Sequence, residues 1–167
     1  AVLYRNPISG LAVVLPVFAL GSLAGWVVAI RVNMLQIPAM VAFQNGAGGA
    51  AAFLVSLVEL TRHTAHLTTI SKDAGILGLV TGAATFSGSM IASAKLANRI
   101  KQTPIVLPRH DSVLSGIAAA AFVLGIAAWT AAGPTLLYSL LGLVLLSVLL
   151  GIVFSIRVGG ADMPVLI

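Results

Sequence analysis

The stretch TLLYSLLGLVLLSVLLGIVFSI, residues 135–156, contains no charged residue and is long enough to cross a bilayer as one helix. About 20 apolar residues in a helix span the hydrocarbon core, which is roughly 30 Å thick. Further apolar runs of similar length lie near 9–31, 38–60, 74–97 and 112–132. A spanning helix satisfies its own backbone polar groups, whereas an open sheet in lipid does not. The sequence therefore predicts an all-α membrane protein, a polytopic transmembrane helix bundle.

The composition excludes a water-soluble surface. Of the 167 residues, 59% are hydrophobic and 8% are charged, and the mean hydropathy is +1.11. A soluble domain carries about 25% charged residues. The basic residues stand at the ends of the apolar runs and do not form the dense basic face that nucleic acid requires. Without cysteine, thiolate metal sites and disulfides are excluded. We therefore expect the lipid bilayer as a partner and no nucleic acid.

Lysine and arginine predict the orientation of the spans. One set of helix ends holds six of these residues and the opposite set holds three. Because basic residues gather on the inner side of a membrane, we expect the richer set to face the cytoplasm or the mitochondrial matrix. The richer set is Arg31, Lys95, Arg99, Lys101, Arg109 and Arg157, and the other set is Arg5, Arg62 and Lys72.

An internal repeat links the first and last spans. IRVNMLQIPAM (30–40) returns as IRVGGADMPVLI (156–167), each with Ile-Arg-Val, four variable residues, an Ile or Met, and a proline. A proline in the first turn of a helix loses no hydrogen bond. The repeat therefore predicts that Pro164 opens a sixth helix equivalent to 38–60, so that the sequence holds five complete spans and the start of a sixth. The alternative is that Ile167 is a true C-terminus and that residues 165–167 pack at the interface.

Small residues concentrate in the span near 38–60. Gly46 with Ala50, and Gly48 with Ala52, have the small-xxx-small spacing that lets two membrane helices approach closely. We expect these glycines and Gly49 to pack against another helix. A dinucleotide-binding loop around Gly46 and Gly48 is excluded, because no strand precedes it and no acidic residue follows at the required distance.

Polar residues inside the predicted spans are candidates for function because their burial in lipid is costly. Thr85, Ser89 and Ser93 recur every four residues and form a hydroxyl stripe suited to border a narrow file of water. The structural alternative for each is a bond to a carbonyl of its own helix. The Asn45 amide cannot satisfy itself and must meet another helix or water.

The predicted loops contain the three histidines and a possible helix cap. His63, His66 and His110 fall outside the spans, where histidines are usually solvated, and none stands in an HExxH motif. Asp73 is placed to cap the N-terminus of the span at 74–97.

Four segments in the same order resemble one known family. TFSGSMIASAKL (85–96), KQTPIVLPRH (101–110), VNMLQIPAMVAFQNGAGG (32–49) and GGADMPVLI (159–167) are similar to segments of the beta subunit of proton-translocating nicotinamide nucleotide transhydrogenase. The resemblance implies an enzyme that couples proton movement to hydride transfer between NAD(H) and NADP(H). It implies that this chain binds neither cofactor. An NADP(H)-binding domain follows the membrane part, and the NAD(H)-binding domain belongs to the alpha subunit.

The same resemblance implies a place in an assembly. Residues 1–167 would be a segment of the transmembrane domain, without a nucleotide-binding domain, packed beside other membrane helices of the enzyme. The membrane would be the bacterial inner (plasma) membrane or the mitochondrial inner membrane, and the assembly would be a homodimer.

The resemblance also assigns roles to individual residues. Thr85, Ser87, Gly88 and Ser89 match the helix beside the proton path. Asn45 is the repeat counterpart of a functional asparagine that follows the second proline. Asp162 matches the acidic residue that, in the family, lies on the inside face near the hinge to the nucleotide domain. Arg157 lies on the same face and is assigned to the same coupling. One position departs from the family: its proton-carrying histidine, fourteen residues before Thr85, is Ser71 here, and His66 is the nearest substitute.

Two other functions remain open from the sequence. A non-catalytic membrane scaffold or assembly subunit derived from the family would explain Ser71 and the sparse charge inside the spans. An unrelated small-solute transporter with repeats would need charged substrate-binding residues in the spans.

Overall fold

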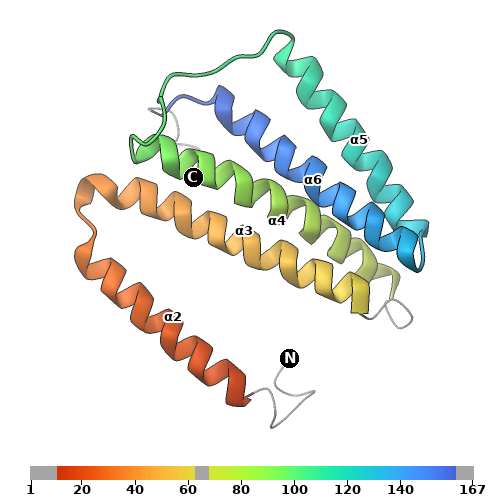
Figure 1. Ribbon diagram of the computed structural model, residues 1–167, viewed down its shortest axis with the longest axis horizontal. Helices are drawn as coiled ribbons and strands as arrows, with labels where there is room; N and C mark the ends of the chain where they lie inside the picture. Colours follow the sequence, from red (N-terminus) through yellow and green to blue (C-terminus); the bar gives the residue numbers. More distant parts are fainter. Residues whose placement is uncertain (1–10, 63–67, 161–167) are drawn as a thin grey trace. The chain divides into compact units, whose positions relative to one another are not determined.

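The computed structural model describes residues 11–62 and 68–160, and these are helical without strands (Figure 1). Five helices are long and apolar enough to cross a membrane, so the all-α transmembrane prediction is confirmed and the chain is a multi-pass membrane protein. The helices are α2 (Leu11–Arg31), α3 (Ile37–Arg62), α4 (Thr69–Leu96), α5 (His110–Thr130) and α6 (Pro134–Arg157), with a 3₁₀ turn, η1 (Met34–Gln36), before α3.

The chain divides into two compact units, residues 1–37 and 38–167. In the first unit, α2 carries Pro16 inside the helix and ends at Arg31. Its side chains are apolar around the whole circumference, which is typical of a helix surrounded by lipid or by other membrane helices. The second unit contains nearly all of α3 and the whole of α4, α5 and α6, and it holds the candidate site.

The start of α4 differs from the sequence prediction. The helix begins at Thr69 rather than near residue 74, because Thr68 caps it: the Thr68 hydroxyl accepts a bond from the Ser71 backbone N–H at 3.2 Å. The prediction that Asp73 caps this helix is therefore wrong. Asp73 lies inside the helix, where its carboxylate accepts a bond from the Trp129 indole N–H on α5 at 2.9 Å.

The other helix ends follow local backbone chemistry. α4 ends before Asn98, whose positive φ of 57° suits a residue type that tolerates the left-handed conformation. Gly133 takes a positive φ of 62° before Pro134, which opens α6 at the position where a missing N–H costs nothing.

Helix α4 lies between α3 and α6, and its backbone approaches both (Figure 1). On the α3 side, a Cβ added to Gly49 would lie 2.7 Å from the Phe86 backbone nitrogen, and one added to Gly82 would lie 2.8 Å from the Gly49 carbonyl oxygen. On the α6 side, a Cβ added to Gly151 would meet the Ala84 carbonyl oxygen at 2.2 Å. Glycine is required at these points because any side chain would separate the helices.

The structure places the other predicted packing glycines differently from one another. Gly88 faces α6, where an added Cβ would lie 3.4 Å from the Gly151 carbonyl oxygen. Gly46 faces α4, with the Met90 methyl group 2.4 Å from its added Cβ position. Gly48 has no heavy atom of the described chain within 4 Å of that position. The face of α3 that meets α4 therefore runs through Gly46 and Gly49 at helical spacing.

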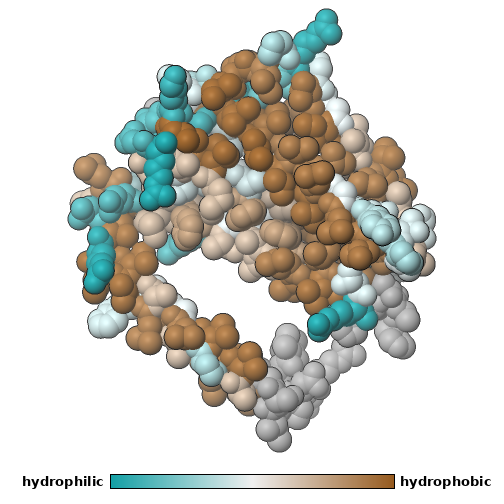
Figure 2. Space-filling model, viewed as in Figure 1, coloured by the Kyte–Doolittle hydropathy of each residue, from teal (hydrophilic) through white to brown (hydrophobic). Residues whose placement is uncertain are grey.

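The hydrophobic core lies in the half of the second unit where α5 joins α6. Its buried members are Leu60, Leu79, Ala121, Ala128, Leu136, Leu140 and Leu143. The outward-facing side chains are apolar as well, among them Phe122 and Leu145, which are exposed. Apolar residues cover most of the visible flank in Figure 2, and hydrophilic residues gather near helix ends. This distribution fits a bundle surrounded by lipid.

We expect Gly151→Ala to lower the free energy of unfolding by about 1–3 kcal/mol, the usual effect of overpacking. The added methyl group would meet the Ala84 carbonyl and the Ser87 hydroxyl, both 2.2 Å away. The matched control is Gly116→Ala in α5, where nothing lies within 4 Å. Denaturant titration of both variants in detergent measures the difference, and equal stability of the two would refute the close-contact interpretation.

Candidate functional site

A cleft of about 540 Å³ lies among the helices of the second unit, with lining residues from α3, α4, α5 and α6. Most of its walls are apolar. The side chains that bring hydrogen-bonding groups to it are Asn45, Thr85, Ser89 and Ser155. The structure thus gathers two residues of the predicted hydroxyl stripe and the predicted intramembrane amide at one cleft.

Asn45 and Ser89 form the central polar contact of the cleft. The Asn45 Nδ2 group donates to the Ser89 hydroxyl oxygen at 3.0 Å, across the interface between α3 and α4. The amide therefore has a partner on another helix, as its position inside a predicted span requires. Asn45 is exposed and lines the cleft, so its amide is also accessible to water there.

The third residue of the stripe, Ser93, binds the neighbouring helix directly. Its hydroxyl donates to the Ala39 carbonyl oxygen of α3 at 2.8 Å. Ala39 lies in the first turn of α3. Ser93 thus holds the end of α3 against α4, and Thr85 and Ser89 line the cleft.

The opposite face of α4 bonds to α6. The buried Ser87 hydroxyl lies 2.9 Å from the Val148 carbonyl oxygen, and the Ser155 hydroxyl donates to the Gly88 carbonyl oxygen at 2.9 Å. These reciprocal bonds stand beside the Gly151 contact. They fix the rotation of α4, so that the stripe of Thr85 and Ser89 faces the cleft.

Other predicted residues lie away from the cleft. Ser71 is in the first turn of α4, where its hydroxyl is 2.8 Å from that of Thr68. Eighteen residues separate it from Ser89, which corresponds to about 27 Å along a helix. The structure therefore gives Ser71 a place in the helix cap and does not bring it to the cleft. His66 and Asp162 fall outside the described residues.

Lys95 stabilises the end of α6, a role that the sequence analysis did not assign to it. Its side chain is buried, with 1% exposed, and its ammonium group donates to the Ser155, Ile156 and Val158 carbonyl oxygens at 3.2, 2.8 and 2.6 Å. The last carbonyls of a helix lack intrahelical partners, and a cation suits them. Lys95 thus caps the C-terminus of α6. The sequence did contain a signal for this position: Lys95 stands at helical spacing from Gly88 and Ala92, so all three share the face of α4 toward α6.

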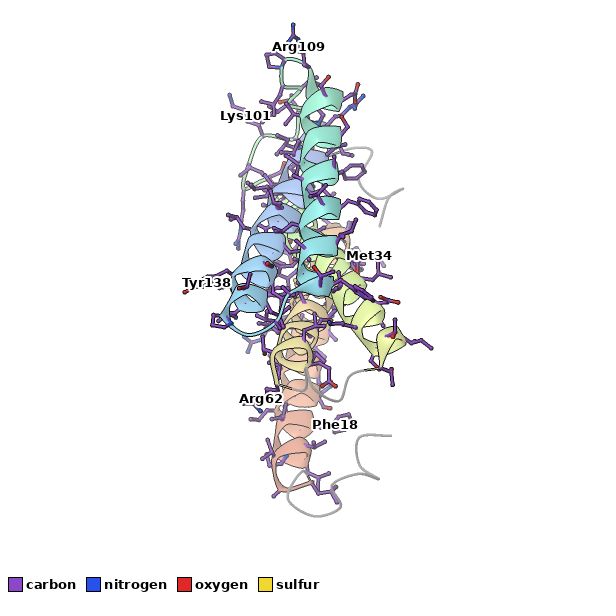
Figure 3. All side chains as sticks on the ribbon, turned by 90° about the vertical axis from the view of Figure 1, so that its right-hand side faces the viewer. Phe18, Met34, Arg62, Lys101, Arg109 and Tyr138 are labelled. Carbon is purple, nitrogen blue, oxygen red and sulfur yellow. The ribbon has the colours of Figure 1, made fainter. Side chains whose placement is uncertain are left out.

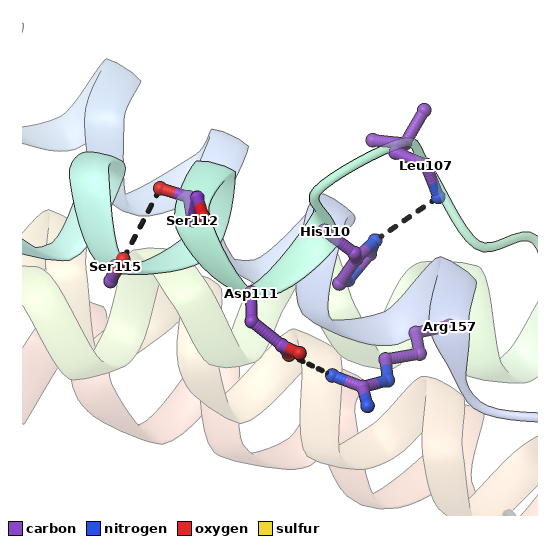
Figure 4. A network of polar contacts seen from close by, with 6 residues as sticks. All are labelled: Leu107, His110, Asp111, Ser112, Ser115 and Arg157. Carbon is purple, nitrogen blue, oxygen red and sulfur yellow. Dashed lines mark hydrogen bonds and ion pairs between the residues drawn. The ribbon is translucent and has the colours of Figure 1, made fainter.

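The same end of the unit carries an exposed ion pair. The Arg157 guanidinium of α6 contacts the Asp111 carboxylate of α5 (Figure 4). Lys101 and Arg109 also lie at this end, and Arg62 lies at the opposite end (Figure 3). This arrangement agrees with the uneven distribution of basic residues from which the orientation was predicted.

His110 is buried, so the expectation of a solvated loop histidine is wrong for this residue. It is the first residue of α5 and only 4% exposed. Its Nδ1 atom accepts a bond from the Leu107 N–H at 3.4 Å (Figure 4). The physical reason is the turn before α5, in which Arg109 takes a positive φ of 55° and directs the next side chain inward.

At the opposite end, α4 is fastened to α5. The Lys72 ammonium donates to the Trp129 carbonyl oxygen at 2.7 Å and lies 5.5 Å from the centre of the indole ring. Together with the bond from Trp129 to Asp73, these contacts tie the first turns of α4 to the end of α5. A tryptophan with polar partners is typical of the membrane–water interface.

Comparison with known proteins identifies the family. The family model described as NAD(P) transhydrogenase beta subunit matches residues 2–167. The chain belongs to this family. Two sequences from Rhodospirillum rubrum, each named NAD(P) transhydrogenase subunit beta, are 31% identical over 161 residues, covering 89% of this chain and 33% of each relative. The chain therefore spans about a third of the length of these relatives.

The family match confirms the resemblance found in the sequence. It places the cleft, with Asn45 and Ser89, in a transhydrogenase beta subunit sequence. Among residues 11–62 and 68–160 of this beta-subunit segment, no group of three His, Cys, Asp or Glu side chains is arranged to hold a metal ion. The polar groups at the cleft are amides and hydroxyls, which bind and order water.

We expect Lys95→Met to lower the free energy of unfolding by about 2–3 kcal/mol, because the α6 carbonyls lose a charged donor. The matched control is Lys101→Met, at an exposed position of the following loop. Denaturant titration in detergent compares the two variants. If Lys95→Met is as stable as Lys101→Met, the capping role of Lys95 is excluded.

Proposed function

We propose that this chain forms part of the proton-translocating membrane domain of an NAD(P) transhydrogenase. Hydride transfer between NAD(H) and NADP(H) takes place in other domains, and this segment contributes the path of the proton. The observation that supports the proposal best is the Asn45–Ser89 bond at a cleft between four apolar helices of a transhydrogenase family member. Polar side chains at such a place mark ion or proton pathways in membrane proteins.

The cleft suits a chain of water molecules. A volume of about 540 Å³ holds several waters, since one molecule occupies about 30 Å³ in the liquid. Asn45 of α3 and Thr85 and Ser89 of α4 line the cleft and offer hydrogen-bond donors and acceptors to water. Protons pass along ordered waters that such groups hold in line, and the apolar walls separate this file from lipid.

Coupling requires that the state of the nucleotide domains changes access to the cleft. In the proposed cycle, NADP(H) occupancy favours an opening toward one face, and release favours the other. Because the two equilibria are linked, proton access and nucleotide affinity influence each other reciprocally. The connection would run through the inside end of the unit, where Arg157 lies and where the chain continues to Asp162.

The proposal includes the surroundings of the segment. Its partners would be the NADP(H)-binding domain, the alpha subunit with the NAD(H)-binding domain, and further membrane helices of the enzyme, assembled as a homodimer. The membrane would be a bacterial inner membrane or the mitochondrial inner membrane, with the end that carries Lys101 and Arg109 inside.

We expect Asn45→Leu to slow coupled proton movement in the complete enzyme about tenfold, the effect of losing one hydrogen bond of about 1.4 kcal/mol. Acidification of sealed vesicles, followed with a pH-sensitive dye, measures the rate. Gln44→Leu is the matched control, because Gln44 is exposed and does not line the cleft.

An unchanged rate for Asn45→Leu would remove Asn45 from the proton path. If the wild-type vesicles carry out hydride transfer without any proton movement, the proton-translocating function itself is refuted and the scaffold alternative is favoured.

A further inference from the structure

The His110 imidazole is a buried group whose bonding is incomplete. Nδ1 accepts from the Leu107 N–H at 3.4 Å, and Nε2 is buried with no hydrogen-bond partner among the described residues. A neutral imidazole that accepts at Nδ1 carries its proton on Nε2, so the atom without a partner is an N–H donor. Buried donors almost always have a partner, so Nε2 calls for one that the described protein atoms do not supply, such as a water molecule.

The position of His110 relates it to the cleft. His110, Leu114 and Ala118 are four residues apart and share one face of α5. Leu114 and Ala118 line the cleft. His110 lies one turn beyond Leu114, about 6 Å farther along the helix axis toward the inside end. His110 therefore lies just beyond the cleft-lining Leu114, on the same face of α5.

The charged residues at this end of the unit come from three helices and the loop between α4 and α5. Arg109 precedes His110, Arg157 comes from α6, and Lys95 comes from α4, with Arg99 and Lys101 in the connecting loop. Among the described residues at this end, the acidic group is Asp111, which is paired with Arg157. The N-terminus of α5 adds its own positive partial charge. The charged groups around this end of α5 are therefore mostly basic.

We propose that His110 is the proton-transfer group at the inside end of the cleft. This inference rests on the proposed function, and it adds a residue that the sequence had assigned to a solvated loop. In the outward step, Nδ1 gains a proton from the inside, as its contact with Leu107 opens, and Nε2 releases its proton to water in the cleft. In the inward step, Nε2 gains a proton and Nδ1 loses one. The ring is neutral after either step, and the observed bonding of Nδ1 is that of the inward product.

The test uses the complete transhydrogenase in sealed vesicles, with His110→Asn as the main variant. The asparagine Oδ1 atom can accept the Leu107 N–H in place of Nδ1, so the turn is preserved, but the amide does not titrate near neutral pH. We expect proton movement to fall about 100-fold, a usual contribution of general acid–base catalysis. We also expect the dependence of the residual rate on pH between about 5 and 8 to flatten.

Two further variants keep the test decisive. Ser112→Asn, at an exposed position in the same turn of α5, is the matched control and should retain the wild-type rate and pH profile. His110→Ala should lose proton movement and regain part of it when free imidazole is added to the buffer, because imidazole replaces the missing proton carrier.

The inference is overturned if folded His110→Asn keeps the wild-type rate and pH profile. It is also overturned if imidazole fails to restore His110→Ala while the melting temperature of that variant matches the wild type. These outcomes differ from failure of the proposed function, in which the wild-type vesicles themselves move no protons during hydride transfer.

Discussion

The close approach of α4 to both of its neighbours is the constraint on which the rest of the second unit depends. Gly49 and Gly82 bring the α3 and α4 backbones together, and Gly151 does the same for α6 and α4. Membrane helices associate through such packing because lipid supplies little hydrophobic driving force. The hydroxyl stripe of α4 lies along its α3 side, where Ser89 meets Asn45 and Ser93 meets the Ala39 carbonyl oxygen, and Thr85 and Ser89 also border the cleft. The cleft lies there because α5 packs on α6 and stays apart from most of α4.

The two sets of hydroxyls on α4 show how position decides role. Ser87 and Ser89 are two residues apart and therefore point in different directions on the helix. Ser87 meets the carbonyls of α6 and is buried, whereas Ser89 meets the amide of Asn45 at the cleft. The same chemical group thus supplies packing on one side and a hydrogen-bonding wall on the other.

Hydropathy predicted the spans well because crossing a bilayer imposes both length and composition. It did not predict the polar contacts at the helix ends, because those depend on which helices are neighbours. Lys95 was counted among the basic residues of one membrane face, yet its ammonium group bonds to the last carbonyl oxygens of α6. Asp73 was assigned to a cap that Thr68 provides, and its actual partner, Trp129, lies on another helix. Ser71 occupies the position of the family's proton-carrying histidine when residues are counted back from Thr85. Because α4 begins early, this position falls in the helix cap.

The polar contacts of α5 with its neighbours differ between its two ends. Toward the outer end, α5 contributes Ala121 and Ala128 to the buried core, and Trp129 is bonded to both Lys72 and Asp73. At the other end, among the described residues, the side-chain bond between α5 and α6 is the Arg157–Asp111 pair, whose side chains are 50% and 82% exposed. An exposed ion pair contributes only about 0–1 kcal/mol. The described polar contacts therefore hold α5 mainly at its Trp129 end, and at the Arg157 end the helix is held by packing, with His110 buried.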